Sequence, residues 1–152
     1  MSAARPPVRV AVLGTGAIAQ VVHLPILSRM RGVEVCAVVD VDHAKAATLA
    51  GRFGVQVVPR DQDEVWADPS VEAVVICTPS HLHETHVREA LSAGKYVLCE
   101  KPLALTAEGV ERILAEEGAD GRLLVAMNQR FRPDAVALRS FVAGGELGEI
   151  FY

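Results

Sequence analysis

The groups best suited to chemistry begin with a glycine-rich turn that directly follows an apolar run. Its members are Gly14, Thr15, Gly16, Ala17, Ile18 and Ala19. In a G-x-G-x-x-A turn the first glycine permits a tight bend, and the second lets the backbone approach a pyrophosphate at the N-terminus of the next helix. The run predicts a dinucleotide-binding turn, although an ordinary glycine turn between strand and helix has the same pattern.

A carboxylate at the end of the next apolar run strengthens this prediction. Asp40 follows residues 33–39, where an acidic side chain can accept hydrogen bonds from the hydroxyls of an adenosine ribose. The same charge would repel the 2′-phosphate of NADP, and Lys45 is the nearest cation, so we expect NAD rather than NADP. Asp40 could instead cap a helix, a role that Asp42 is equally placed to fill.

Two further loops carry polar residues after apolar runs. Lys101 lies in a Glu100-Lys101-Pro102 sequence after residues 96–99, where its ammonium could contact a substrate hydroxyl or carbonyl and stabilise developing alkoxide charge. The alternative is an ordinary surface lysine. We also expect the Lys101-Pro102 peptide bond to be cis, which would turn Lys101 off its strand.

The other loop follows residues 73–77 and contains Thr78, Pro79 and three histidines, His81, His83 and His86. We expect Thr78 and Pro79 to shape a loop beside the nicotinamide half of a cofactor. The histidines could suggest a metal site, because two of them are one helical turn apart. No further ligand completes such a set, so we interpret them as a polar helix start and assign no metal.

Apolar runs that alternate with helical periodicity must position these loops. The runs cover residues 8–13, 33–39, 55–58, 73–77, 96–99 and 123–127. Asp42 and Thr106 are placed to cap two of the helices between them, Gly54 is placed to end one, and Pro25 should kink or end the first. This alternation predicts an α/β fold, a doubly wound parallel Rossmann sheet of six strands.

Composition limits the remaining classes of function. The chain has 152 residues, is 51% hydrophobic and carries a formal charge of -4. No basic stretch suggests nucleic acid, and no apolar run reaches membrane-spanning length. Three cysteines, Cys36, Cys77 and Cys99, lie near the ends of apolar runs, which favours buried thiols in a reducing compartment and a cytoplasmic location.

The turn-rich stretch near the C-terminus suggests a domain boundary. We expect a dinucleotide-binding domain over residues 1–144. Residues 145–152 should begin a second α/β substrate domain that is otherwise absent, with 149–152 opening a strand.

Together these motifs resemble the Gfo/Idh/MocA family of oxidoreductases. The resemblance rests on residues 10–19, on Thr78-Pro79-Ser80-His81-Leu82-His83, on residues 93–104 with their E-K-P sequence, and on residues 128–133 and 145–150. It covers essentially the whole chain.

This resemblance implies a hydride transfer between NAD(H) or NADP(H) and a sugar, an inositol or a related polyol or carbonyl compound. It implies a catalytic role in proton transfer for Lys101. It also implies cofactor contacts from the glycine turn, from Asp40, Thr78, Pro79 and His83, and from Glu100 and Lys101. The intact protein is expected to be a homo-oligomer.

The family's catalytic His and its Asp partner lie in the C-terminal domain, so we expect this chain alone to bind cofactor without turnover. One alternative is a non-catalytic dinucleotide-binding module that acts as a sensor or regulatory subunit. Another is a Rossmann-like scaffold that binds no nucleotide, and Gly14, Gly16 and Asp40 argue against it.

Overall fold

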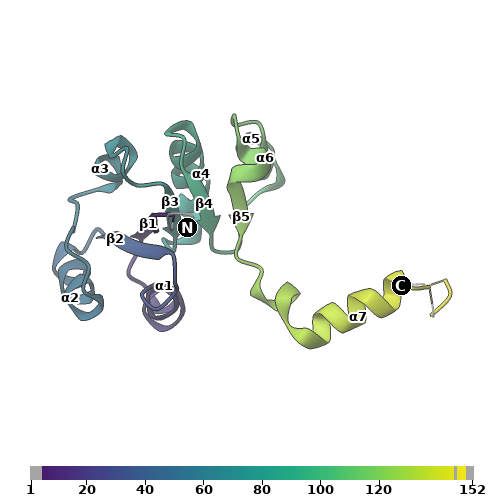
Figure 1. The fold of residues 1–152 in the computed structure, drawn as a ribbon. Coiled ribbons are helices and arrows are strands. Elements are labelled where there is room, and N and C mark those ends of the chain that lie inside the picture. Colours follow the sequence, from purple (N-terminus) through teal and green to yellow (C-terminus); the bar gives the residue numbers. More distant parts are fainter. Residues whose placement is uncertain (1–4, 146, 150–152) are drawn as a thin grey trace.

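A parallel sheet of five strands forms the centre of the molecule (Figure 1). The computed structural model describes residues 5–145 and 147–149. The strands are β1 (Val8–Leu13), β2 (Val33–Val39), β3 (Ala73–Ile76), β4 (Tyr96–Cys99) and β5 (Leu123–Val125), in the order β2-β1-β3-β4-β5. Nearly continuous apolar strands are typical of a parallel sheet covered on both faces. The order reverses at β1, so the loops after β1 and β3 flank a switch point, where ligands bind in such folds.

The prediction of six strands is wrong. Residues 55–58 make only an isolated parallel bridge between Ala37 and Val57, with one hydrogen bond of 3.3 Å from Val38 N to Val57 O. This segment lies at the outer side of β2 and is followed by Pro59, which cannot donate to a ladder. One bridge therefore forms where a strand was expected. The last strand is also shorter than expected and ends at Val125 instead of Met127.

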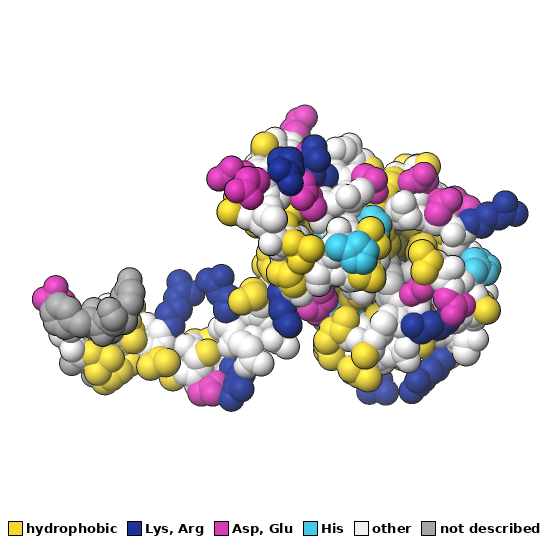
Figure 2. Space-filling view, turned by 180° about the vertical axis from the view of Figure 1, so that it is seen from behind, with side chains coloured by type: hydrophobic (Ala, Val, Ile, Leu, Met, Phe, Trp, Pro, Cys, Tyr) yellow, Lys and Arg dark blue, Asp and Glu magenta, His cyan; other side chains and the backbone are white. Residues whose placement is uncertain are grey.

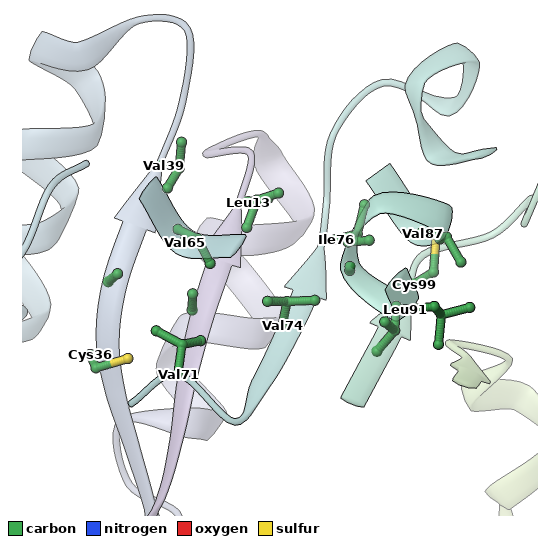
Figure 3. Packing of buried hydrophobic residues seen from close by; sticks show 14 of the residues in the cluster. Leu13, Cys36, Val39, Val65, Val71, Val74, Ile76, Val87, Leu91 and Cys99 are labelled. Carbon is green, nitrogen blue, oxygen red and sulfur yellow. The ribbon is translucent and has the colours of Figure 1, made fainter. Parts of the chain in front are cut away.

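Two apolar cores lie on the two faces of the sheet. One face is covered by the π turn η1 (Ala19–His23), α1 (Leu24–Leu27) and α2 (His43–Phe53). The other is covered by α3 (Gln62–Ala67), α4 (His83–Ser92), α5 (Ala107–Leu114) and α6 (Ala119–Arg122), with η2 (Ser80–Leu82) directly before α4. Figure 3 shows buried residues of this second core. All three cysteines are free and buried, Cys36 in β2, Cys77 just after β3 and Cys99 at the end of β4.

Several helix ends are those the sequence predicts. Asp42 caps α2 by accepting a hydrogen bond from Lys45 N at 3.0 Å, and Gly54 ends that helix in the left-handed conformation. Thr106 caps α5 through Gly109 N. The π turn ends at His23, two residues before Pro25, and the helix that contains Pro25 ends at Leu27. A π turn is one way for a helix to accommodate a proline that lacks an N–H.

The C-terminal helix α7 (Pro133–Ala143), reached through η3 (Asn128–Phe131), extends away from the sheet and its helices (Figures 1 and 2). Its apolar residues Leu138, Phe141 and Val142 are exposed. The strand expected to open at 149–152 lies mostly outside the described residues. No helix in the described part of the chain is long and apolar enough to cross a bilayer.

Candidate functional site

The carboxyl ends of four neighbouring strands lie at one edge of the sheet. Leu13 pairs with Val39 on one side and with Ile76 on the other, and Ile76 pairs with Cys99. The residues that follow these strand ends are therefore neighbours along this edge, where all the candidate loops begin. Asp40 lies on one side of the glycine turn, and Glu100 and Lys101 lie on the other, beyond the loop after β3.

The glycine turn packs closely against the loop after β3. Gly14 has φ +87°, and a Cβ built on it would lie 2.6 Å from the carbonyl oxygen of Cys77. Gly14 N also donates to Val39 O at 2.8 Å, and the side chain of Gln20 donates to Thr15 O at 2.7 Å. The close packing of the turn therefore requires a glycine at position 14 even when no ligand is bound. A Cβ on Gly16, in contrast, would meet only Cys77 O, at 3.9 Å.

Thr15 connects the turn to Asp40. Its backbone N–H and its hydroxyl both donate to Asp40 Oδ2 at 2.6 Å, and Asp42 N donates to Oδ1 at 2.9 Å. Burial raises the pKa of Asp40, but the hydrogen bonds from Thr15 and Asp42 outweigh it, so the pKa lies below its usual value of 3.8. The Asp40 carboxylate is thus ionised and held in one orientation, with acceptor capacity left on Oδ1.

A cavity of about 150 Å³ lies beside Asp40. Its lining combines an apolar wall with a few polar groups, as ligand sites usually do. The lining residues are Leu13, Gly14, Val39, Asp40, Val41, Gln62, Thr78, Pro79, Leu82 and His86. Five of the residues singled out from the sequence therefore meet in one cavity: Gly14, Asp40, Thr78, Pro79 and His86.

His83 lies beneath the loop after β3 and is 1% exposed. Its Nε2 contacts Thr78 O at 2.9 Å, and its Nδ1 contacts Pro102 O at 2.6 Å. This side chain therefore ties the Thr78-Pro79 loop to the segment after Lys101. His86 is also buried and contacts the Thr78 hydroxyl through Nδ1 at 3.1 Å. Burial lowers the pKa of His86.

Glu100 and Lys101 follow β4. The Glu100 side chain is 15% exposed, and its Oε1 contacts His23 Nε2 at 2.8 Å. Lys101 is exposed, and its backbone N–H donates to Glu100 Oε2 at 3.2 Å. The Lys101-Pro102 peptide bond is cis, as predicted. Of the remaining turn residues, Ala17 is exposed and Ile18 half-buried.

Sequence reasoning missed two sets of residues at this edge. One is His23, whose pairing with Glu100 joins positions 77 residues apart and leaves no local pattern. The other is the set of cavity residues Val41, Gln62 and Leu82. Val41 follows Asp40 directly, so its place could have been inferred from the end of β2. Gln62 comes from a helix on a different crossover, which no spacing indicates.

This arrangement of strands, glycine turn and acidic residue defines a nucleotide-binding Rossmann domain. The model of an oxidoreductase family with an NAD-binding Rossmann fold matches residues 8–128. The chain therefore belongs to the Gfo/Idh/MocA family, as its motifs suggested.

Relatives of known name agree with this family. An inositol 2-dehydrogenase of Acidothermus cellulolyticus is 40% identical over 93% of this chain and 42% of its own length. A D-glucoside 3-dehydrogenase of Escherichia coli is 33% identical over 95% of this chain and 42% of its own length. The chain thus spans less than half the length of these curated relatives.

Solved structures have the same fold. A myo-inositol dehydrogenase of Lactobacillus casei, in complex with NAD(H) and myo-inositol, matches with a TM-score of 0.85 and 33% identity over 91% of this chain and 42% of that one. A 3-ketoreductase of Actinomadura kijaniata, in complex with TDP-benzene and NADP, matches with a TM-score of 0.81 and 30% identity over 91% of this chain and 44% of that one. The first was solved with NAD(H) and the second with NADP, so fold likeness alone does not select between these cofactors.

Proposed function

We propose that this chain binds NAD(H) along the carboxyl edge of its sheet. The observation that carries the proposal is the Thr15–Asp40 contact, which fixes an ionised acceptor beside the glycine turn and the neighbouring cavity. The open space around Gly16 fits the close approach of a pyrophosphate. The turn residues from Gly14 to Ile18 would hold the phosphates, and Asp40 would accept from the adenosine ribose.

The cofactor preference follows from the charge of Asp40. An ionised carboxylate at this place would face the 2′-phosphate of NADP with like charge, and among the described residues no basic side chain is hydrogen-bonded to it. Lys45, at the start of α2, acts on Asp40 only through its field, which lowers the pKa of that carboxyl. We therefore propose a preference for NAD over NADP.

On the other side of the turn, Glu100 and Lys101 follow β4 and would lie beside the nicotinamide half. Thr78 and Pro79 were expected beside the nicotinamide half, but they line the cavity near Asp40, which supports a contact nearer the adenosine instead. His83 would support the cofactor by holding the Thr78-Pro79 loop, since both its ring nitrogens already contact backbone carbonyls.

We propose that the intact protein transfers a hydride between nicotinamide and a carbinol or carbonyl carbon of a sugar, an inositol or a related polyol. When bound, the nicotinamide accepts or supplies that hydride at its C4. Lys101 would contact the substrate oxygen and exchange its proton. The names of the relatives, which act on inositol or a glucoside, support this substrate class. We also propose that the intact protein is a homo-oligomer. The three free thiols favour a reducing compartment, so we propose a cytoplasmic location.

A titration with NADH tests the binding proposal. The wild-type chain should bind NADH more tightly than NADPH, and Gly16→Val should lose most of the NADH affinity because its side chain would occupy the space of the pyrophosphate. The melting temperature of Gly16→Val, measured in parallel, controls for folding. Equal NADH affinity of the two proteins would show that the site is misplaced, and equal affinity for NADH and NADPH would refute the preference.

A second assay tests turnover. We expect this chain alone to bind NAD but to produce no NADH from inositols or aldoses, because Lys101 is the only described side chain that we assign to the substrate. Hydride transfer also needs the substrate to be oriented against the nicotinamide. NADH formation at an ordinary enzymatic rate, lost in Lys101→Ala, would contradict this expectation.

A further inference from the structure

A buried contact joins the helix after the glycine turn to the loop after β4. His23 ends the π turn η1, and its Nε2 lies 2.8 Å from Glu100 Oε1. The two side chains are only 11% and 15% exposed. The first comes from the crossover between β1 and β2, and the second follows β4. This pair therefore connects segments on the two sides of the switch point.

The second carboxylate oxygen of Glu100 is also engaged. Oε2 accepts from the backbone N–H of Lys101 at 3.2 Å, and Glu100 N itself donates to Ile76 O at 3.0 Å. Glu100 is thus fixed on one side to β3, through its backbone, and on the other to His23, through its side chain. Whatever orients this carboxylate also orients the peptide that carries the Lys101 side chain.

The charge of Glu100 makes such a partner necessary. Burial, together with the nearby Glu100 carboxylate, raises the pKa values of Cys77 and Cys99 to about 12. The carboxylate, with only 15% of the side chain exposed, therefore lies near two buried thiols, where an unpaired charge is costly. A nitrogen donor from His23 offsets this cost and selects one orientation for the carboxylate.

The strand order indicates what this carboxylate would meet. Asp40 lies after β2, the glycine turn after β1, and Glu100 after β4, two strands beyond β1. A dinucleotide with its adenosine at Asp40 and its pyrophosphate at the turn would extend toward β3 and β4 with its nicotinamide half. We propose that His23 is a positioning residue for that half, which acts by holding Glu100 and the Lys101 peptide in place. This inference rests on the proposed NAD(H) binding.

The test compares NADH with ADP-ribose, which lacks the nicotinamide ring. In His23→Leu we expect the NADH affinity to fall about tenfold, in line with the loss of one hydrogen bond to a charged group. The ADP-ribose affinity should change less than about twofold on the same affinity scale. The fluorescence enhancement of bound NADH should also decrease, because the nicotinamide is less well held.

Two amide variants separate positioning from packing. His23→Gln can bring an N–H near the place of Nε2 and should restore the NADH affinity, whereas the shorter His23→Asn should not. If His23→Leu fails to fold, this pair still decides the question. His81→Leu, at an exposed site on η2, is a matched histidine control and should leave both affinities unchanged.

A double variant tests whether the effect passes through Glu100. With Glu100→Gln already present, His23→Leu should cause little further loss of NADH affinity, since no buried charge remains to be held. Additive losses, an equal loss of NADH and ADP-ribose affinity, or no loss at all would each overturn the inference. If the wild type binds neither ligand, the proposed function fails, and this inference fails with it.

Discussion

Substituting the first glycine of the turn should destabilise the fold even without a ligand. In Gly14→Ala, the new Cβ would lie 2.6 to 2.8 Å from three backbone atoms of Cys77 and Thr78, none of which can move as a side-chain tip would. The left-handed φ of +87° adds about 1–2 kcal/mol for a residue with a Cβ. Overpacking typically adds about 1–3 kcal/mol. We expect a loss of about 2–5 kcal/mol in the free energy of unfolding.

Two other glycines make this prediction specific. Gly54 has φ +73°, but an added Cβ there would meet nothing within 4 Å, so Gly54→Ala should show the backbone penalty alone. Gly16 is outside the left-handed region, and its nearest contact would be 3.9 Å away, so Gly16→Ala should change stability very little. The order of destabilisation should therefore be Gly14, then Gly54, then Gly16.

The assay is thermal unfolding of the ligand-free chain, followed by circular dichroism. For a domain of this size each kcal/mol lowers the melting temperature by about 2–4 °C, so Gly14→Ala should melt roughly 4–20 °C below the wild type. Denaturant unfolding gives the free energies directly. If the melting temperatures of Gly14→Ala and Gly54→Ala differ by only about a degree or two, the turn does not pack as closely against the loop after β3 as described.

Three further variants test other contacts. The lowered pKa of Asp40 means that its ionised form contributes stability above pH 3.8, and this is lost as the pH falls through the lowered value. Wild type and Asp40→Asn should therefore differ in stability at neutral pH and converge in acid; a constant difference would contradict this. Thr15→Val removes the hydrogen bond from the Thr15 hydroxyl to Asp40. It should lower the ratio of the NADPH dissociation constant to the NADH dissociation constant several-fold. An unchanged ratio would show that the hydroxyl has no part in cofactor selectivity. His83→Leu removes the ring-nitrogen contacts with the carbonyls of Thr78 and Pro102 and should lower the free energy of unfolding in urea by about 1–3 kcal/mol, whereas exposed His81→Leu should change it very little. Equal effects of the two substitutions would show that these contacts do not stabilise the fold.

Local patterns were enough to predict much of this fold. Asp42 and Gly54 lie at the ends of α2 as expected, because capping depends on residues within one turn of the helix. The glycine turn and Asp40 were found because each directly follows a strand, and parallel strands end at a common edge.

Features that depend on distant partners were not predictable in this way. Residues 55–58 have the composition of a strand, yet they form a single bridge, to Ala37. How many bridges form depends on the backbone groups at the outer side of β2, which the local sequence does not specify. His23 pairs with Glu100 because the fold brings the π turn after β1 next to the loop after β4, and these segments are far apart in the sequence. The exposure of the apolar residues on α7 likewise depends on tertiary contacts that helical periodicity does not specify.

The buried cysteines give this chain three built-in reporters of local opening. With pKa values raised to about 12 by burial and by nearby Glu100, Cys77 and Cys99 have roughly a thousandfold less reactive thiolate at neutral pH than an ordinary thiol of pKa 9.0. Alkylation at these sites must wait until the surrounding structure opens. Cys36 lies in β2, Cys77 directly follows β3, and Cys99 ends β4, so their separate labelling rates would resolve which strand leaves the sheet first.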